Sequence, residues 1–243
     1  MDPLLIEVPE RIETERLVLR VPRRGDGPTV NAAVAASLVE LQPWLPWAGA
    51  MPTVDESEAT CRRQQGRFIL REDFVMLMFL RTADGSEGEL VGGTGLHRID
   101  WTLRRFEIGY WRKTGCAGRG FVTEAVRAIA RLAFDRLDAC RVEIRMDDAN
   151  VRSWQVAERA GWLDEVRSLG CVAVVTNHAL ADAAMLGRVR AAGLRALVYT
   201  VNDPDEARRL EALGIDGIVT DAVDRFAQDD TGPIGSSAPR TRA

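Results

Sequence analysis

The sequence predicts a mixed α/β (α+β) fold, followed by a smaller unit of alternating strands and helices. Strand-like segments alternate with helices up to residue 162, and all six tryptophans lie at or before that position. Beyond it, short apolar runs alternate with helices in the order β-α-β-α-β. The final stretch is rich in Gly, Pro and Ser. We therefore expect a first domain over 1–162, a partial second domain over 163–226 and a disordered tail over 227–243.

Apolar alternation predicts the strands of the first domain, and apolar residues at helical spacing predict its helices. Ala125, Ile129 and Leu132, for example, fall on one face of a helix. Acidic residues near position 55 favour the first turn of another helix. We expect strands over 15–22, 74–85, 89–100, 104–111 and 140–147, and helices over 28–45, 54–73, 123–137 and 150–161.

The second part shows helix boundaries in its sequence. Asp203 is placed to cap a helix, Pro204 occupies its first position and Gly214 ends it. Strands separated by helices pair in parallel through right-handed crossovers, so we expect a βαβαβ unit. Its strands are predicted over 171–176, 195–201 and 217–221, and its helices over 181–193 and 203–214.

Composition and charge exclude several classes of protein. The net charge is −4, so we expect neither a nucleic-acid partner nor a membrane partner. No uncharged apolar run reaches the ~18 residues of a membrane span, and the acidic N-terminus lacks the apolar core of a secretory signal. We therefore expect a cytoplasmic protein. Its four cysteines (Cys61, Cys116, Cys140 and Cys171) are expected to be free thiols.

A predicted strand runs into a glycine-rich loop that opens a helix, over residues 106–126. Glycine allows backbone N–H groups to turn toward an anion without interference from a Cβ atom. The helix N-terminus adds aligned dipoles and unpaired donors, which favour a pyrophosphate. By itself the pair Gly118 and Gly120 also fits an ordinary turn between a strand and a helix. The loop is therefore a candidate phosphate site.

Six segments together resemble the GNAT superfamily of acetyl-CoA-dependent N-acetyltransferases, over residues 8–162. In order they are TERLVLRVP, LQPWLPW, LVGGTGLHRID, FEIGYW, GRGFVTEAV and NVRSWQVAERAGW. They are most similar to the branch that acetylates the N-termini of ribosomal proteins. The resemblance implies the GNAT acyl-CoA N-acyltransferase fold with a splayed mixed sheet, here lacking its usual last strands. It also implies acetyl-CoA as acetyl donor, with no metal.

The resemblance implies three groups of cofactor-binding residues. The loop holds the pyrophosphate, the preceding strand holds the pantetheine arm through its main chain, and the start of the next helix contacts that arm. The family has Arg or Gln where this chain has Gly115, so we expect a less strongly shaped loop. The implied residues are Gly115, Ala117, Gly118, Arg119, Gly120 and Phe121; Ile108, Gly109, Tyr110 and Trp111; and Asn150 and Ser153.

The resemblance also implies the catalytic roles. Ser153 is the candidate acid for the departing thiolate, because the chain has Ala157 where other branches have a tyrosine acid. Glu107 is the candidate base that accepts a proton from the amine. His97 is the other titratable candidate for that role. We expect Cys116 to be structural, since the family transfers acetyl directly, without a covalent cysteine intermediate.

Residues 163–226 resemble the last part of bacterial glycerophosphodiester phosphodiesterases. The matching strings are VVTNHAL, YTVND and GIDGIVTD. That family is a TIM barrel, so this part is expected to be a βαβαβ fragment of one. The family's metal-binding and acid–base segments near the start of the barrel have no counterpart here. Asn177, His178, Thr200 and Asn202 are therefore interpreted as remnants of a barrel mouth.

The sequence thus predicts an acyltransferase that moves acetyl from acetyl-CoA to a primary amine, the amine of a protein N-terminus, by direct attack. Two alternatives stay open. One is a phosphodiesterase, which the missing segments disfavour. The other is a non-catalytic acyl-CoA-binding or interaction protein. The sequence leaves the oligomeric state open.

Overall fold

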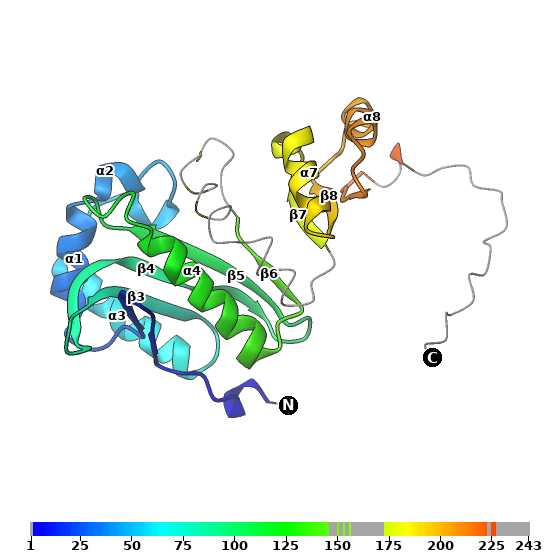
Figure 1. Ribbon diagram of the computed structural model, residues 1–243. Coiled ribbons are helices and arrows are strands. Elements are labelled where there is room, and N and C mark those ends of the chain that lie inside the picture. Colours follow the sequence, from blue (N-terminus) through cyan, green and yellow to red (C-terminus); the bar gives the residue numbers. More distant parts are fainter. Residues whose placement is uncertain are drawn as a thin grey trace. The chain divides into compact units, whose positions relative to one another are not determined.

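The computed structural model describes residues 2–145, 150, 153, 156, 173–222, 225 and 226. The chain divides into two compact units, Met1–Leu169 and Gly170–Ala243. The first unit contains a six-stranded sheet covered by helices, and the second contains a three-stranded sheet (Figure 1).

The sheet of the first unit follows the chain from one edge to the other. Neighbouring strands are antiparallel, except that the last two are parallel. This confirms the predicted mixed sheet. The strands are β1 (Arg11–Glu13), β2 (Leu17–Arg20), β3 (Phe74–Arg81), β4 (Glu87–Asp100), β5 (Arg105–Arg112) and β6 (Arg141–Glu143).

The parallel pairing of β5 with β6 is short. Arg105 to Glu107 pair with Arg141 to Glu143. Beyond Glu107, β5 continues to Arg112, and among the described strands only β4 pairs with that part. The two strands therefore separate after three residue pairs, as the splayed sheet of the resembling family implies.

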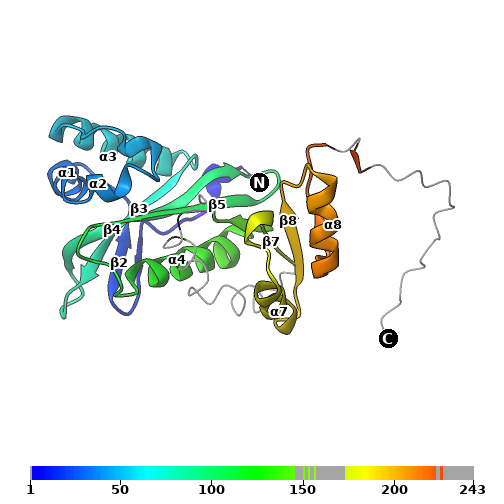
Figure 2. The same cartoon turned by 90° about the horizontal axis from the view of Figure 1, so that it is seen from above.

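Helices cover both faces of this sheet. Figure 2 shows α1 (Gly27–Ala35), α2 (Leu38–Leu41) and α3 (Val54–Ile69) on one face, and α4 (Phe121–Arg131) on the other. Under α4, buried strand residues such as Met76, Leu96, Phe106 and Ile108 pack with Ala125, Val126 and Ile129. On the other face Val18, Leu77, Phe79 and Leu90 pack with Ala33. Since both faces are covered, all four residues of β2 are buried.

The helix predicted over 28–45 is two helices, α1 and α2, and this prediction is wrong. Ser37 interrupts it: its hydroxyl donates to the carbonyl of Ala33 at 2.7 Å, and its backbone leaves the helical region. The same hydroxyl accepts a hydrogen bond from the N–H of Thr114 at 2.9 Å. The break therefore fixes the α1–α2 junction to the loop that follows β5.

Other differences concern element ends. The strand β1 and the 3-10 turns Pro3–Leu5 and Pro46–Ala48 carry no clear sequence signal. The helix predicted over 123–137 is α4 followed by a π-helical turn, Leu132–Arg136. The strand predicted over 140–147 is shorter, and part of it lies outside the described residues. Of the helix predicted over 150–161, only residues 150, 153 and 156 are described, and the last two are helical.

The second unit has the predicted βαβαβ order. Its strands pair in parallel, which confirms the prediction. Asp203 caps α8 by accepting a hydrogen bond from the N–H of Asp205, and Gly214 ends it with φ +88°. Ala181, Val198 and Leu210 form the centre of its small core. The elements are β7 (Ala173–Asn177), a 3-10 turn (His178–Leu180), α7 (Ala183–Ala191), β8 (Arg195–Tyr199), α8 (Pro204–Leu213) and β9 (Gly217–Ile218).

Phe106 provides a test of the first unit's core. Its side chain is fully buried, and its ring centroid lies 5.4 Å from that of Trp101. Phe106→Ala should lower the free energy of unfolding of this unit by ~3–5 kcal/mol, because the change leaves a large cavity. Since all six tryptophans belong to the first unit's sequence, tryptophan fluorescence during denaturant unfolding reports on this unit.

The control is Leu103→Ala, since Leu103 is 60% exposed. This change should stay within ~0.5 kcal/mol of the unaltered protein. Equal midpoints for the two variants would contradict the described core.

Candidate active site

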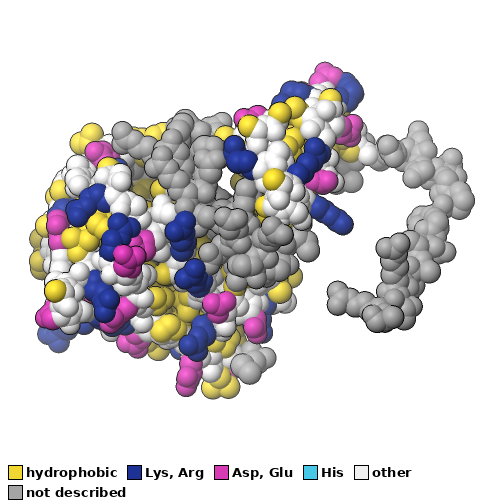
Figure 3. Space-filling view, in the orientation of Figure 1, with side chains coloured by type: hydrophobic (Ala, Val, Ile, Leu, Met, Phe, Trp, Pro, Cys, Tyr) yellow, Lys and Arg dark blue, Asp and Glu magenta, His cyan; other side chains and the backbone are white. Residues whose placement is uncertain are grey.

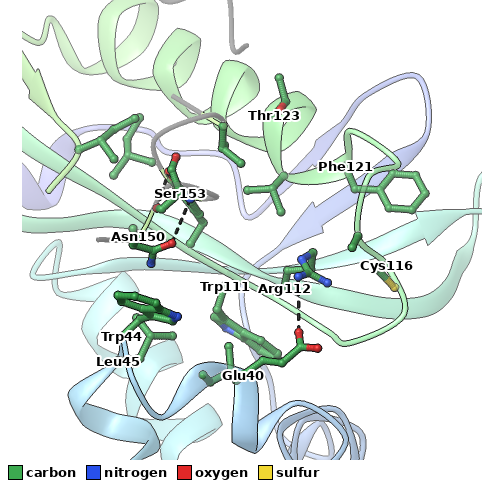
Figure 4. Close-up of a pocket in the computed structure, with 18 of the residues that line it drawn as sticks. Glu40, Trp44, Leu45, Trp111, Arg112, Cys116, Phe121, Thr123, Asn150 and Ser153 are labelled. Carbon is green, nitrogen blue, oxygen red and sulfur yellow. Dashed lines mark hydrogen bonds and ion pairs between the residues drawn. The ribbon is translucent and has the colours of Figure 1, made fainter. Parts of the chain in front are cut away.

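A pocket of about 750 Å³ lies where β5 separates from β6. It is lined by residues from β5, the loop after it and the start of α4, by residues 40–45 at the end of α2 and after it, and by residues that follow β6 (Figure 4). Twelve of the thirteen residues implied as catalytic or cofactor-binding lie in this lining: Glu107, Ile108, Gly109, Tyr110, Trp111, Gly115, Ala117, Gly118, Gly120, Phe121, Asn150 and Ser153. Arg119 and the alternative base His97 are not part of it. The site therefore assembles segments that are distant in sequence.

The loop between β5 and α4 offers backbone rather than side chains to the pocket. Gly115, Gly118 and Gly120 have φ values of +87°, +70° and +76°, which residues with a Cβ atom rarely adopt. A Cβ atom at Gly115 or Gly118 would meet no other atom within 4 Å. Gly120 is the N-cap of α4 and supplies no capping side chain. The first N–H groups of α4 thus stay available for an anion, so the loop fits a phosphate group.

The first turn of α4 also contains an acidic residue, Glu124, whose negative charge is compensated by its hydrogen-bond and ion-pair partners. The carboxylate of Glu124 accepts hydrogen bonds from Thr14 Oγ1 at 2.6 Å and from Arg16 N at 2.9 Å, and it pairs with the Arg16 guanidinium at 2.6 Å. Burial raises the pKa of Glu124, but these hydrogen bonds outweigh burial and lower the pKa below its ordinary value. Arg16 also donates to the carbonyl of Arg119, so it fixes the loop.

The side chain of Arg119 does not line the pocket. Its guanidinium carbon lies 4.6 Å from the centre of the Phe121 ring. The predicted contact of Arg119 with the phosphates therefore stays a prediction. The ring of Phe121 contacts a second arginine, since the guanidinium carbon of Arg16 lies 5.1 Å from its centre.

The strand β5 borders the pocket along its separated part. Ile108 lines the pocket, and it is buried in the core under α4. The indole of Trp111 lies over Gly93 of β4, where a Cβ atom would come within 2.5 Å of the indole nitrogen. Trp47 packs against Trp111 edge to face at 5.9 Å. Trp111 is therefore a fixed wall of the pocket.

Asn150 and Ser153 stand across the opening from β5 (Figure 4). Asn150 Oδ1 accepts a hydrogen bond from the N–H of Ser153 at 3.1 Å, as expected of a cap. The hydroxyl of Ser153 lies 3.0 Å from the hydroxyl of Tyr110, which itself donates to the Ser153 carbonyl at 2.9 Å. Burial raises the pKa of Tyr110 to about 12, despite the opposing hydrogen bond with Ser153. Tyr110 thus keeps its proton at neutral pH.

The two candidate bases have different surroundings. Glu107 lines the pocket, and its carboxylate pairs with Arg98 and with Arg145, each at 3.3 Å. His97 lies next to it on β4, and its Nδ1 atom is 2.7 Å from Asp73 Oδ1. Cys116 is buried in the pocket lining. The assignment of roles among these residues stays a prediction.

Sequence reasoning missed one wall of the pocket. The α2 segment, residues 38–45, comprises α2 and the residues that follow it. It contributes Glu40, Leu41, Trp44 and Leu45 to the lining. Glu40 pairs with Arg112 of β5 at 3.5 Å (Figure 4). The two tryptophans of LQPWLPW were a usable signal, because aromatic side chains outside a strand or a long helix often serve binding.

Comparison with protein families identifies the family of the chain that forms this pocket. The model of the acetyltransferase (GNAT) domain matches residues 16–162, which is more than half of the chain. The chain belongs to the GNAT acetyltransferase family. The predicted family, the enzyme class and acetyl-CoA as the donor that this family uses are thereby confirmed.

Three relatives illustrate the similarity. The chain is 29% identical over 149 residues to the ribosomal-protein-serine acetyltransferase of Escherichia coli, covering 60% of this chain and 79% of that protein. It is 39% identical over 79 residues to a Bacillus subtilis protein named "Putative ribosomal N-acetyltransferase YdaF", covering 32% of this chain and 43% of that protein. The chain is also similar to a solved structure of RimL, a ribosomal L7/L12 α-N-protein acetyltransferase, in complex with coenzyme A. The TM-score is 0.55 and the identity 23%, and the match covers 62% of this chain and 82% of that chain. The GNAT fold is thus confirmed.

A second family model matches the C-terminal part. The glycerophosphoryl diester phosphodiesterase family matches residues 125–225, which confirms the second resemblance. This match begins before residue 163 and overlaps the acetyltransferase match over 125–162. Among the described residues, no group of three or more His, Cys, Asp or Glu could hold a metal ion.

The surface and helices of the described part carry two further observations. On the face seen in Figure 3, positive and negative side chains are interspersed rather than gathered by sign. Ion pairs such as Lys113 with Glu89 at 2.7 Å are an example of this mixing. No helix in the described ranges has the length and apolar character needed to cross a membrane.

Gly120 tests the phosphate loop. Gly120→Val should weaken acetyl-CoA binding at least tenfold, ~1.4 kcal/mol, because valine is strained at φ +76° and its side chain would stand where the first N–H groups of α4 meet an anion. Titration calorimetry of the full chain with acetyl-CoA measures the change.

Gly85→Val is the matched control. Gly85 has φ +82° in the turn between β3 and β4, with no atom nearer than 3.8 Å to a Cβ placed there. This variant carries similar backbone strain and should bind acetyl-CoA normally. A folded Gly120→Val protein with unchanged affinity would remove the loop from the site.

Proposed function

We propose that this chain transfers an acetyl group from acetyl-CoA to a primary amine, the α-amine of a protein N-terminus, by direct attack. The observation that carries the proposal is one pocket that joins the glycine loop, the separated part of β5, and Ser153. The names of the Escherichia coli relative and of RimL, both ribosomal-protein acetyltransferases, support a protein acceptor.

The residues present fit acetyl-CoA as the donor substrate. The N–H groups from Gly118 to the first turn of α4 would bind the pyrophosphate. The main chain of Ile108 to Trp111, which pairs only with β4 among the described strands, would bind the pantetheine arm. Asn150 borders the same opening. Acetyl-CoA supplies the thioester, whose acetyl group is already activated toward an amine.

Ser153 is proposed as the acid that protonates the departing thiolate. In the free protein its hydroxyl bonds to Tyr110. The Tyr110 hydroxyl donates to the Ser153 carbonyl and so holds this residue in place, and the Ser153 hydroxyl would turn from Tyr110 to the sulfur to donate its proton. The assignment of Glu107 as base remains a prediction. The position of Glu107 in the pocket lining supports a role as base. Its ion pairs with Arg98 and Arg145 argue against that role, because they favour the ionised carboxylate.

The α2 side of the pocket supports a protein acceptor. Trp44, Trp47 and Met51 are 40%, 52% and 39% exposed, and Trp44 lies in the pocket lining. Exposed apolar side chains next to a site are typical of surfaces that bind another protein. A small free amine would not need them. A peptide N-terminus could enter along this wall while its following residues cover the tryptophans.

We also propose that the second unit hydrolyses no phosphodiester and that the domain limits lie at 162 and 226. His178, the histidine at the end of β7, is paired with Glu206 at 2.9 Å, so it is part of a local contact. The described residues offer no metal-binding group. Fold resemblance alone does not carry activity. The partial phosphodiesterase unit is thus assigned a packing role.

The acceptor is tested with peptides. The full chain is incubated with acetyl-CoA and short peptides that begin with Ser, Ala or Met and carry one internal Lys. Matched peptides have a formylated N-terminus. Release of free thiol measures turnover, and mass spectrometry locates the acetyl group. We expect acetylation of the free α-amine and none of the formylated peptides.

Two other outcomes have distinct meanings. Acetylation of lysine in both peptide sets would contradict the N-terminal acceptor and leave the acetyltransferase. Acetyl-CoA binding without turnover on any peptide would favour the non-catalytic acyl-CoA-binding alternative and would overturn the proposed function.

Ser153→Ala tests the acid. It should lower kcat for acetyl transfer by ~10²-fold or more while the Kd for acetyl-CoA changes little, since the hydroxyl acts on the departing thiolate. Tyr110→Phe removes the partner hydroxyl alone and should lower kcat less. If Ser153→Ala keeps full kcat, the thiolate receives its proton from another group.

A further inference from the structure

One histidine, His97, lies next to two residues that line the pocket, Glu107 and Gly109. His97 of β4 pairs directly with Glu107 of β5, so the two side chains share one face of the sheet. Gly109 lies two residues further along β5, on that same face. The side chain of His97 is 30% exposed. The side chain of His97 is thus partly accessible to solvent.

A carboxylate fixes the ring of His97. Its Nδ1 atom lies 2.7 Å from Asp73 Oδ1. Asp73 is 12% exposed, and its other oxygen pairs with Arg67 of α3 at 2.9 Å. A carboxylate at Nδ1 favours the tautomer with its proton there, which leaves the lone pair on Nε2. None of the described residues is hydrogen-bonded to Nε2.

His97 does not itself line the pocket, but the free edge of its ring lies against Gly109, which does. A Cβ atom on Gly109 would lie 2.7 Å from Cδ2 and 2.9 Å from Nε2 of His97. The Nε2 edge therefore lies directly over Gly109, and only glycine leaves room for it. Gly109 lines the pocket, and it belongs to the part of β5 that is proposed to bind the pantetheine arm of the donor.

Glu107 is less suited to accept a proton. Its carboxylate pairs with two guanidinium groups, those of Arg98 and Arg145. Taking up a proton would weaken both ion pairs at once. The imidazole of His97 has no such cost, and imidazole is the side chain that most readily takes and releases a proton near neutral pH.

We infer that His97 is the general base of acetyl transfer and that Asp73 is its positioning residue. The inference rests on the acetyl transfer proposed above. Nε2 takes one proton from the acceptor's ammonium group. The amine nitrogen then forms a bond to the acetyl carbon as the carbon–sulfur bond breaks. Of the two protons left on nitrogen, one stays on the amide, and the other replaces the proton that Ser153 gives to sulfur.

The test compares pH profiles of kcat/KM for the full chain with acetyl-CoA and the best peptide of the panel above. The charged groups around the imidazole are Asp73, Arg67, Glu107 and Arg98. Rate should fall at low pH, where Nε2 is protonated. His97→Gln should lower kcat/KM by ~10²–10⁴-fold and abolish this acidic limb. The Kd for acetyl-CoA should not change.

Asp73→Asn separates positioning from packing. Without the carboxylate at Nδ1, the ring loses the partner that favours its Nδ1-protonated tautomer, so kcat should fall while KM changes little. In the acetyl-CoA-bound protein, the nitrogen NMR signals of the His97 ring should show the loss of that tautomer. His178→Gln is the matched control, because His178 carries a similar contact with Glu206 at 2.9 Å and is the only other histidine. It should leave the rate and the profile unchanged.

Each outcome has one meaning. A His97→Gln protein with the unaltered rate and acidic limb would overturn the inference. So would loss of the limb in Glu107→Gln but not in His97→Gln, which would assign the base to Glu107. Unchanged nitrogen NMR signals of the His97 ring in the Asp73→Asn protein would overturn the positioning role. An unaltered chain that binds acetyl-CoA and acetylates no peptide would overturn the proposed function, and the inference with it.

Discussion

The geometry of the site depends on where the parallel pairing of β5 with β6 stops. After Glu107 the main chain of β5 has a strand partner on one side only among the described residues. Unpaired backbone N–H and C=O groups need partners, and a bound ligand can provide them. The same separation creates the space that Ser153 and Asn150 border from the other side. A sheet that paired β5 along its whole length would have neither the space nor the free donors.

Anion binding at the start of α4 depends on how the charge of Glu124 is compensated. A helix N-terminus attracts anions, yet this one carries Glu124 in its first turn. The carboxylate does not compete with a ligand, because Thr14 and Arg16 bind it. Arg16 therefore has two roles: it neutralises Glu124, and it holds the loop through the carbonyl of Arg119. A loop without an Arg or Gln at the position of Gly115 gains its shape in part from this distant residue.

Sequence reasoning found the elements whose signals are local. Asp203, Pro204 and Gly214 delimit α8 as predicted, because capping is a contact within one turn. The glycine loop and its helix were found for the same reason. The break at Ser37 was not, since a serine within an apolar helical pattern shows no sign of the distant N–H of Thr114 that it binds. The wall formed by the α2 segment was missed likewise, because it faces the pocket only once the helices are packed.

The limits of local pattern are clearest for the two histidines. Each has Nδ1 against a carboxylate at similar distance, His97 with Asp73 and His178 with Glu206. In sequence neither pair is visible, since the partners lie 24 and 28 residues away. What separates them is the other edge of the ring. That of His97 lies over Gly109 in a pocket lining, whereas His178 follows a strand in a unit whose described residues hold no metal group. A carboxylate–imidazole pair can take part in a reaction only where the free ring nitrogen lies near a binding site. The packing of the sheet decides this position, and the pair itself does not.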